Sequence, residues 1–313
     1  MSFASEVKQE LCLLQLEDRN AMSQLAAMLQ ANSAVTLSQD PKIIASFSSM
    51  TIARRFSLLV KQLYQVSIEV KKITTNYLGR DSYQVEIVDR VKDILQDSGL
   101  YTDQGFHDSV APSLLTRNDG IRCFLAGWFL AKGSVNSPKS ANYHCEFRTE
   151  KKTQAELIAR LLKRFNINGK VTKRRHEYIA YVKASDEVAD VLRLLGAAQG
   201  LMEFENVRIS RDFHNSLTRL DNCEVANEMK SIQAGSKQVE AIEKLIEYGR
   251  LEFMEQRIQQ VAHLRLVYPE ASLNELAGYY FDQQQVRISK SGMKHRLDKL
   301  VQAADRIDKE RSS

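Results

Sequence analysis

The sequence predicts an α+β protein in which a duplicated domain of helices and strands is followed by an all-α domain. Three observations predict this: elements recur with a period near one hundred residues, helical and strand-like apolar spacings mix within each repeat, and only helical spacing follows. A chain of 313 residues is long enough for two domains with separate cores. We expect the duplicated domain over residues 1–200, with pseudo-repeats at about 20–100 and 120–197, a linker segment over 201–236 and the all-α domain over 237–313.

The repeat is clearest in two helical segments that begin with Leu-Ala and a small residue. SQLAAMLQANSAV (Ser23–Val35) aligns with CFLAGWFLAKGSV (Cys123–Val135). Such a segment alone is common in packed cores. Matched elements follow both copies, however, and they favour a true duplication: Phe56–Ile73 with Ile158–Arg174, Tyr83–Val88 with Glu177–Val182, and Asp89–Leu100 with Asp186–Ala197.

Strands and turns within each repeat are predicted from alternation and from glycine. VSIEV (Val66–Val70) and YQVEIV (Tyr83–Val88) alternate with period two. Hairpin turns are expected at Leu78–Asp81 and Asn168–Gly169, where glycine supplies the positive φ of a tight turn. Each unit is therefore a helix, a strand pair, a helix, a second strand pair and a closing helix.

An amphipathic helix is predicted at the N-terminus, because Phe3, Val7, Leu11 and Leu14 recur at helical spacing among charged residues. This mixture is unlike a signal peptide, and no apolar run approaches the roughly 20 residues that cross a bilayer. The four cysteines lack the spacing of a zinc site or a disulfide framework: Cys12, Cys123, Cys145 and Cys223. We expect a reduced, cytoplasmic protein with buried thiols, without metal, other cofactor or membrane contact.

The paired helices resemble the signature helices of LAGLIDADG homing endonucleases. The resemblance implies that they pack at a pseudo-two-fold axis, where Ala26–Ala27 and Ala126–Gly127 let the backbones approach. It also implies that the residue before each motif's final small position is an acid that holds a divalent metal for phosphodiester cleavage. Here those positions are Asn32 and Lys132. An amide is a weak neutral ligand and an ammonium repels the ion, so we expect no catalytic residues.

The segment 201–236 interrupts the repeat. It is polar and weakly periodic, and we expect short helices and an interdomain linker. One interpretation makes it a surface segment whose Asn and Asp side chains cap turns. The other gives it a family-specific role, and the residues concerned are Arg219, Asn222, Cys223, Glu224, Ala226 and Asn227.

The C-terminal segment has the pattern of a helix-turn-helix. Val239–Gly249 opens a helical module, and a long helix follows that ends near Pro269. Ser272 and Glu275 have the spacing of a capping box, which marks the next helix start. A connector, Phe281–Ile288, leads to a last helix with one apolar stripe: Met293, Leu297, Leu300, Val301, Ala304 and Ile307.

The start of this last helix has the composition of a recognition helix. Between Arg287 and Lys299 five basic residues face one acidic residue, a net +4, whereas 13 basic and 12 acidic residues nearly cancel over 237–313. The expected phosphate anchors are Lys290, Lys294 and Arg296, and the candidates for base edges are Ser291, His295 and Arg296. The full set of candidate DNA-binding residues is Arg287, Ser289, Lys290, Ser291, Lys294, His295 and Arg296. The alternative is a solvated face on a three-helix bundle.

A second basic cluster lies in the duplicated domain, where eight basic residues face only Glu177 between Arg160 and Lys183, a net +7. Lys173, Arg174 and Arg175 are expected on a hairpin and are candidates for a secondary DNA contact. They are equally well interpreted as a solvated strand edge, since Lys on an edge strand hinders aggregation. The whole chain has a net charge of +5, which permits an anionic partner without requiring one.

Taken together, these blocks resemble the WhiA family of bacterial regulators of sporulation or cell division. The resemblance spans nearly the whole chain and is carried by MSFASEVKQEL, FLAGWFLAKGSVNSP, LTRLDNCEVANEMKS, QVEAIEKL, LRLVYPEASLNELAGYY and ISKSGMKHRLDKL. It implies that the helix-turn-helix contacts DNA through Ser289–Arg296 and Arg287. The connector FDQQQVRI is a few residues longer than the family's usual turn, and Glu224 replaces the usual Asp.

We therefore expect a non-enzymatic, nucleoid-associated regulator that binds double-stranded DNA and acts in cell division, chromosome segregation or transcription control. A monomer is expected because the internal duplication removes one reason for a homodimer. The enzymatic alternative is a residual metal-dependent endonuclease that uses other carboxylates. A third hypothesis makes the LAGLIDADG-like domain a scaffold for a protein partner, with the small domain supplying accessory DNA binding.

Overall fold

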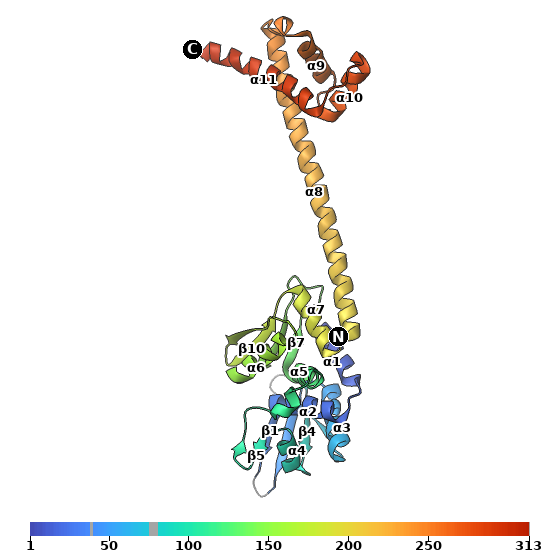
Figure 1. Ribbon diagram of the computed structural model, residues 1–313, viewed down its shortest axis with the longest axis vertical. Helices are drawn as coiled ribbons and strands as arrows, with labels where there is room; N and C mark the ends of the chain where they lie inside the picture. Colours follow the sequence, from blue (N-terminus) through green and yellow to red (C-terminus); the bar gives the residue numbers. More distant parts are fainter. Residues whose placement is uncertain (38–39, 75–80, 313) are drawn as a thin grey trace. The chain divides into compact units, whose positions relative to one another are not determined.

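The computed structural model describes residues 1–37, 40–74 and 81–312 and divides into two compact units, Met1–Arg211 and Asp212–Ser313 (Figure 1). The domain boundaries predicted from the sequence stay predictions beside this division. Leu78–Arg80 of the first predicted hairpin lie outside the described residues.

The N-terminal unit contains two copies of one helix-and-strand arrangement. The first consists of α2 (Asp18–Asn32), β1 (Ser33–Thr36), β2 (Lys42–Phe47), α3 (Met50–Tyr64), β3 (Val70–Thr74), β4 (Asp81–Ile87) and α4 (Val91–Asp97). The second consists of α5 (Asn118–Lys132), β7 (Gly133–Val135), β8 (Cys145–Thr149), α6 (Lys152–Lys163), β9 (Lys170–Arg174), β10 (Glu177–Val182) and α7 (Ser185–Leu195). Helix α1 (Phe3–Leu13) precedes them, and β5 (Tyr101–Thr102), β6 (Gly105–Phe106) and the 3₁₀ helix η1 (Pro112–Leu115) join them.

Both copies form a four-stranded antiparallel sheet with the same strand order, β1-β2-β4-β3 and β7-β8-β10-β9. The duplicated α+β fold predicted from the sequence is confirmed. Apolar side chains on the inward faces, such as Ile43, Val85 and Phe147, are buried in one core that the helices complete. The amphipathic α1 belongs to this core, with Val7 and Leu11 fully buried.

Two local predictions in this unit are wrong. The alternating segment Val66–Val70 is not a strand, because β3 begins only at Val70. Asn168–Gly169 is not a hairpin turn but lies between α6 and β9. The β9–β10 turn instead contains Arg175, whose φ of 58° supplies the left-handed conformation without glycine. Alternation and glycine alone do not identify which of two neighbouring loops reverses the chain.

The signature helices α2 and α5 pack against each other, as the spacing of small residues predicts (Figure 1). Ala27, Leu25 and Leu29 of α2 are buried, as are Leu125 and Trp128 of α5. A Cβ added to Gly127 would lie 2.4 Å from the carbonyl oxygen of Gln24 and 2.9 Å from the Cβ of Ala27. The two backbones therefore approach so closely that only glycine fits at this position.

The C-terminal unit is all-α. Helix α8 (Ala198–Glu247) includes the boundary between the units and is followed by the 3₁₀ helix η2 (Leu251–Phe253), α9 (Gln256–Val267), α10 (Leu273–Gln284) and α11 (Lys290–Ser312). Gly249, with a φ of 60°, lies just beyond the end of α8. The predicted stripe of α11 is confirmed, because Met293, Leu297, Leu300, Ala304 and Ile307 are buried against α8, α9 and α10, and Val301 is partly buried against the same core.

The expectation of short helices and a linker over 201–236 is wrong in its local structure, because the whole segment belongs to α8. Between Gly200 and Gly235 the sequence contains no glycine or proline, so nothing interrupts the helix once it forms. Every residue of 212–230 is exposed, which explains the weak periodicity. None of the helices in the described ranges is long and apolar enough to cross a membrane.

Candidate nucleic-acid interface

The helix-turn-helix begins at the predicted capping box. The backbone N–H of Ser272 donates to Glu275 Oε2 at 2.7 Å, and the N–H of Glu275 donates to Ser272 Oγ at 3.3 Å. The donated bonds stabilise the carboxylate and lower the pKa of Glu275. The start of α10 is therefore fixed by two reciprocal hydrogen bonds, as the sequence predicts.

The connector to α11 is shorter than predicted. Phe281–Gln284 continue α10, and Gln285 ends it in the left-handed conformation, with its N–H donating to the carbonyl of Phe281 at 2.8 Å. Only Gln285–Ser289 connect the helices. Phe281 extends the apolar face of α10 by one more turn. The polar residues Asp282–Gln284 that follow made this last turn resemble a loop in the sequence.

Ser289 is exposed and also caps the N-terminus of α11. Its Oγ accepts a hydrogen bond from the N–H of Gly292 at 3.1 Å, and its carbonyl accepts from the N–H of Met293 at 2.9 Å. Its hydroxyl also lies 3.0 Å from that of Ser291. Ser289 therefore defines where α11 starts and which side chains stand on its first turn.

The exposed side chains at the start of α11 form two rows. Lys290 and Lys294 stand four residues apart on one flank, and Ser291 and His295 stand four residues apart on the outward face. All four are exposed, and Met293 and Leu297 anchor the opposite face in the core. The structure thus brings these four predicted residues together on one accessible helix face.

Arg287 and Arg296 are placed differently from these four residues. The Arg296 guanidinium lies over the ring of Tyr280, 5.2 Å from its centroid, and its Nη1 is buried without a hydrogen-bond partner in the described ranges. Arg287 is exposed in the connector and lies over Phe281 at 5.6 Å. Arg296 is half-buried at the edge of α11, so it is less available to a ligand than the two lysines.

Sequence patterns did not identify Arg265 of α9, which is 2% exposed. Its Nη1 donates to the carbonyls of Tyr268, Pro269 and Ala271 at 3.3, 3.1 and 2.7 Å. These bonds hold the turn that leads from α9 into α10. The only sequence signal is an arginine within an apolar run just before Pro269.

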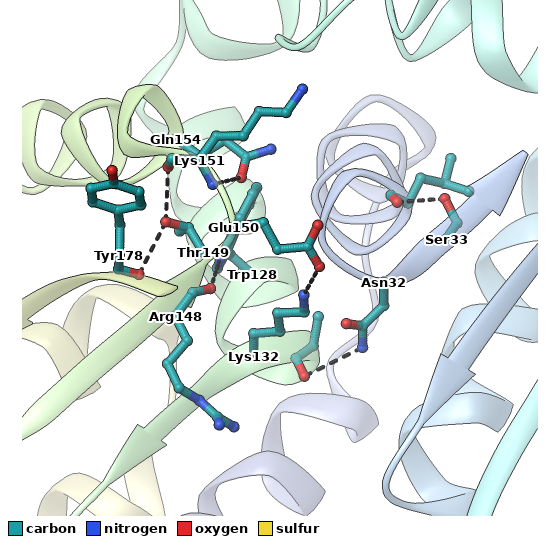
Figure 2. Close-up of polar contacts among 12 residues, drawn as sticks. Asn32, Ser33, Trp128, Lys132, Arg148, Thr149, Glu150, Lys151, Gln154 and Tyr178 are labelled. Carbon is teal, nitrogen blue, oxygen red and sulfur yellow. Dashed lines mark hydrogen bonds and ion pairs between the residues drawn. The ribbon is translucent and has the colours of Figure 1, made fainter. Parts of the chain in front are cut away.

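The ends of the signature helices contain an ion pair where the endonuclease fold would place metal ligands. Asn32 Nδ2 donates to the carbonyl of Ala131 at 3.4 Å, and Lys132 Nζ lies 2.8 Å from Glu150 Oε1 (Figure 2). The Lys132 side chain is only 19% exposed. An ammonium and an amide donate hydrogen bonds here, so these residues do not fit a divalent cation. The described ranges contain no cluster of three His, Cys, Asp or Glu side chains that could hold one.

The second basic cluster lies on an edge strand. Lys173 and Arg174 are on β9, the outermost strand of its sheet, and Arg175 is in the turn to β10. All three are exposed, and Lys173 Nζ lies 5.8 Å from the ring centroid of Tyr178. Their placement on a hairpin is as predicted, and it fits a DNA contact and a solvated edge equally well.

Three of the four cysteine thiols are buried or half-buried, and the fourth is exposed to solvent. Cys12 and Cys145 are buried, Cys123 is half-buried and Cys223 is exposed on α8, and all four are free. Burial raises the pKa of Cys12 and of Cys123 to about 11. The expectation of buried thiols is therefore wrong for Cys223, which lies in the segment of α8 without a packed face.

These features define a class of protein: a duplicated LAGLIDADG-like domain whose signature helices end in Asn32 and Lys132, joined to a C-terminal helix-turn-helix domain. Three family models match the chain: the WhiA N-terminal LAGLIDADG-like domain over 18–101, the WhiA LAGLIDADG-like domain over 121–214 and the WhiA C-terminal HTH domain over 217–304. The chain belongs to the WhiA family.

Known relatives match along almost the entire chain. A "Probable cell division protein WhiA" from Leuconostoc citreum (strain KM20) is 37% identical over 311 residues, covering 98% of this chain and 97% of the relative. One from Staphylococcus epidermidis is 37% identical over 309 residues, 98% of each chain. The crystal structure of full-length DUF199/WhiA from Thermatoga maritima has a TM-score of 0.61 at 23% identity and covers 98% of this chain and 99% of that one, which supports the shared fold.

Proposed function

We propose that this chain is a non-enzymatic regulator that binds duplex DNA through its helix-turn-helix. The observation that carries the proposal is the pair of exposed rows on α11. Lys290 and Lys294 supply charge for phosphates, while Ser291 and His295 supply short polar groups for base edges. The curated relatives are named as probable cell division proteins, and we extend that role, with nucleoid association, to this chain as part of the proposal.

The DNA-binding proposal is tested by comparing two pairs of substitutions in the full chain. We expect Lys290→Ala/Lys294→Ala to weaken binding to a labelled mixed-sequence duplex and to reduce the slope of log affinity against log salt by about 2, because two phosphate contacts are lost. The matched pair Lys173→Ala/Arg174→Ala removes the same charge from β9 and should leave both quantities near wild type. Fluorescence anisotropy across a salt series measures both.

Two outcomes would contradict this assignment. Equal losses for the two pairs would mean that net charge, not the α11 surface, determines binding. Loss confined to the β9 pair would make the sheet edge the DNA contact and α11 a solvated bundle face. Thermal unfolding of each variant controls for folding, and little change is expected because all four side chains are exposed.

We expect no DNA cleavage by the purified chain with Mg²⁺ or Mn²⁺. The reason is that Lys132, paired with Glu150, places an ammonium where the endonuclease fold requires a carboxylate. The measurement is incubation of supercoiled plasmid with wild type and with Lys132→Ala, followed by electrophoresis. Divalent-dependent nicking by wild type that Lys132→Ala retains would revive the endonuclease hypothesis through other carboxylates.

A further inference from the structure

A groove of about 530 Å³ lies within the C-terminal unit, between α8, the start of α10 and the start of α11. One wall is the Lys290–Lys294 flank of α11, and the opposite wall is the part of α8 that contains Asn227 and Lys230. Arg265 of α9 also lines it. The groove therefore joins the proposed DNA-binding helix to a segment of α8 to which the proposed function gives no role.

The lining of this groove is strongly cationic. Lys230, Lys290, Lys294 and Arg265 face a single acidic side chain, Asp298. Among the residues that the structure describes, none of these four cations forms an ion pair. Like charges that converge on a concave surface in excess of their counter-charges raise the local potential and attract an anion.

The buried guanidinium of Arg265 adds an independent observation. It is 2% exposed, its hydrogen bonds go only to uncharged carbonyls, and its Nε has no partner in the described ranges. Burial accordingly lowers the pKa of Arg265. A buried cation without a carboxylate partner is stabilised when an anion binds close to it.

The N-terminus of α10 completes the groove. The capping box satisfies the amides of Ser272 and Glu275, but the first-turn amides of Leu273 and Asn274 have no partner within the helix. Leu273 and Asn274 both line the groove. The positive end of a twelve-residue helix, partly offset by the Glu275 carboxylate that caps it, therefore adds its partial charge to that of the lysines.

We propose that this groove holds a backbone phosphate of duplex DNA, and that Lys230 of α8 is a phosphate-binding residue beside Lys290 and Lys294. The inference rests on the proposed function and extends the interface to a third element. A DNA phosphate fits better than a small free anion because the groove borders the outward row of α11. A strand that passes Ser291 and His295 would bring its phosphodiesters to the lysine flank.

This assignment explains the exposed segment of α8 in physical terms. LTRLDNCEVANEMKS has no packed face, yet the matched HTH family model begins at its first residue, 217, and includes all of it. A helix that contributes Lys230 and the amide of Asn227 to a phosphate site needs polar, exposed side chains there. The segment then belongs to the DNA-binding surface and is more than a spacer.

The test is a single-lysine comparison in the full chain. We expect Lys230→Ala to weaken duplex binding about fivefold at physiological salt, uniformly across sequences, and to reduce the salt slope by about 0.9. The matched control is Lys237→Ala, which removes an exposed lysine from the same helix outside the groove lining and should leave the slope unchanged. Lys230→Arg keeps the charge and should retain the wild-type slope.

The outcomes separate this inference from the proposed function. If wild type does not bind duplex DNA, the proposed function fails and the groove assignment fails with it. If wild type binds and Lys290→Ala/Lys294→Ala abolishes binding, but Lys230→Ala behaves like Lys237→Ala, only the groove assignment is overturned. Circular dichroism of each variant confirms that α8 remains helical.

Discussion

Replacing Gly127 by alanine is expected to lower the free energy of unfolding of the N-terminal unit by about 3 kcal/mol or more. The added methyl would lie 2.4 Å from the carbonyl oxygen of Gln24, and backbone cannot rotate away as a flexible side chain can. Helices α2 and α5 would have to separate, and the buried contacts on both sides would loosen. The change is therefore a test of the packing that the duplicated fold depends on.

Trp128 makes the Gly127 measurement direct. It is the only tryptophan of the chain, it is 1% exposed beside Gly127, and its indole N–H donates to the carbonyl of Arg148 at 3.0 Å. Its fluorescence in a denaturant titration follows the N-terminal unit. The control is Gly278→Ala in α10, where an added Cβ meets nothing within 4 Å and should stabilise the helix by about 0.5–1 kcal/mol, measured by circular dichroism. If Gly127→Ala had the same denaturation midpoint as wild type, the close approach of α5 to α2 at this position would be contradicted.

Replacing Lys8 by methionine is expected to raise the free energy of unfolding at pH 7 by up to about 3 kcal/mol. Burial, and secondarily the nearby Arg148, lowers the pKa of Lys8 from 10.5 to about 8. Below pH 8 the folded chain must hold this charge in a poorly solvated place, and methionine removes that cost. Lys8 Nζ keeps a contact with the Phe129 ring at 5.6 Å, which offsets part of it.

The pH dependence gives the sharper test of the Lys8 prediction. Between pH 8 and 10.5 Lys8 is deprotonated in the folded state but still protonated in the unfolded state, so stability rises with pH through this window. The difference between Lys8→Met and wild type should therefore be largest below pH 8 and shrink toward pH 10.5. Lys92→Met, an exposed lysine on α4, serves as the control and should change stability by less than about 0.5 kcal/mol. A difference that stays constant with pH would contradict the lowered pKa.

The spacing of apolar and capping residues along the chain was enough to predict the helices that pack through one periodic face. The signature helices, the stripe of α11 and the capping box at Ser272 are all present, because each depends on residues three or four positions apart. The repeated order of elements predicted the duplication, and the structure shows that both sheets share one strand order.

The wrong predictions concern segments whose structure depends on contacts between distant residues or on the lack of any packing contact. Helix α8 is packed at both ends and continues through the exposed residues 212–230, where no glycine or proline interrupts it, and amphipathic patterning cannot predict such a segment. The reversal at Arg175 is set by the pairing of β9 with β10, and glycine content pointed to the wrong loop.

Three residues of the observed or proposed sites were missed for the same reason. Glu150 matters only because α5 ends beside it, Arg265 because three carbonyls converge on it, and Lys230 because α8 passes α11. No spacing along the chain encodes any of these contacts. They become visible only when the tertiary structure brings the partners together.

The ion pair of Lys132 with Glu150 gives the centre of the LAGLIDADG-like domain a positive charge that does not depend on a bound metal ion. A bound metal exchanges with solvent, is lost to chelators and is occupied only in proportion to its concentration. A covalently attached ammonium is always present, and it brings its charge without any association equilibrium. The junction of the two repeats is therefore closed by side chains of the chain itself, and the charge of Lys132 there does not vary with the concentration of a metal ion.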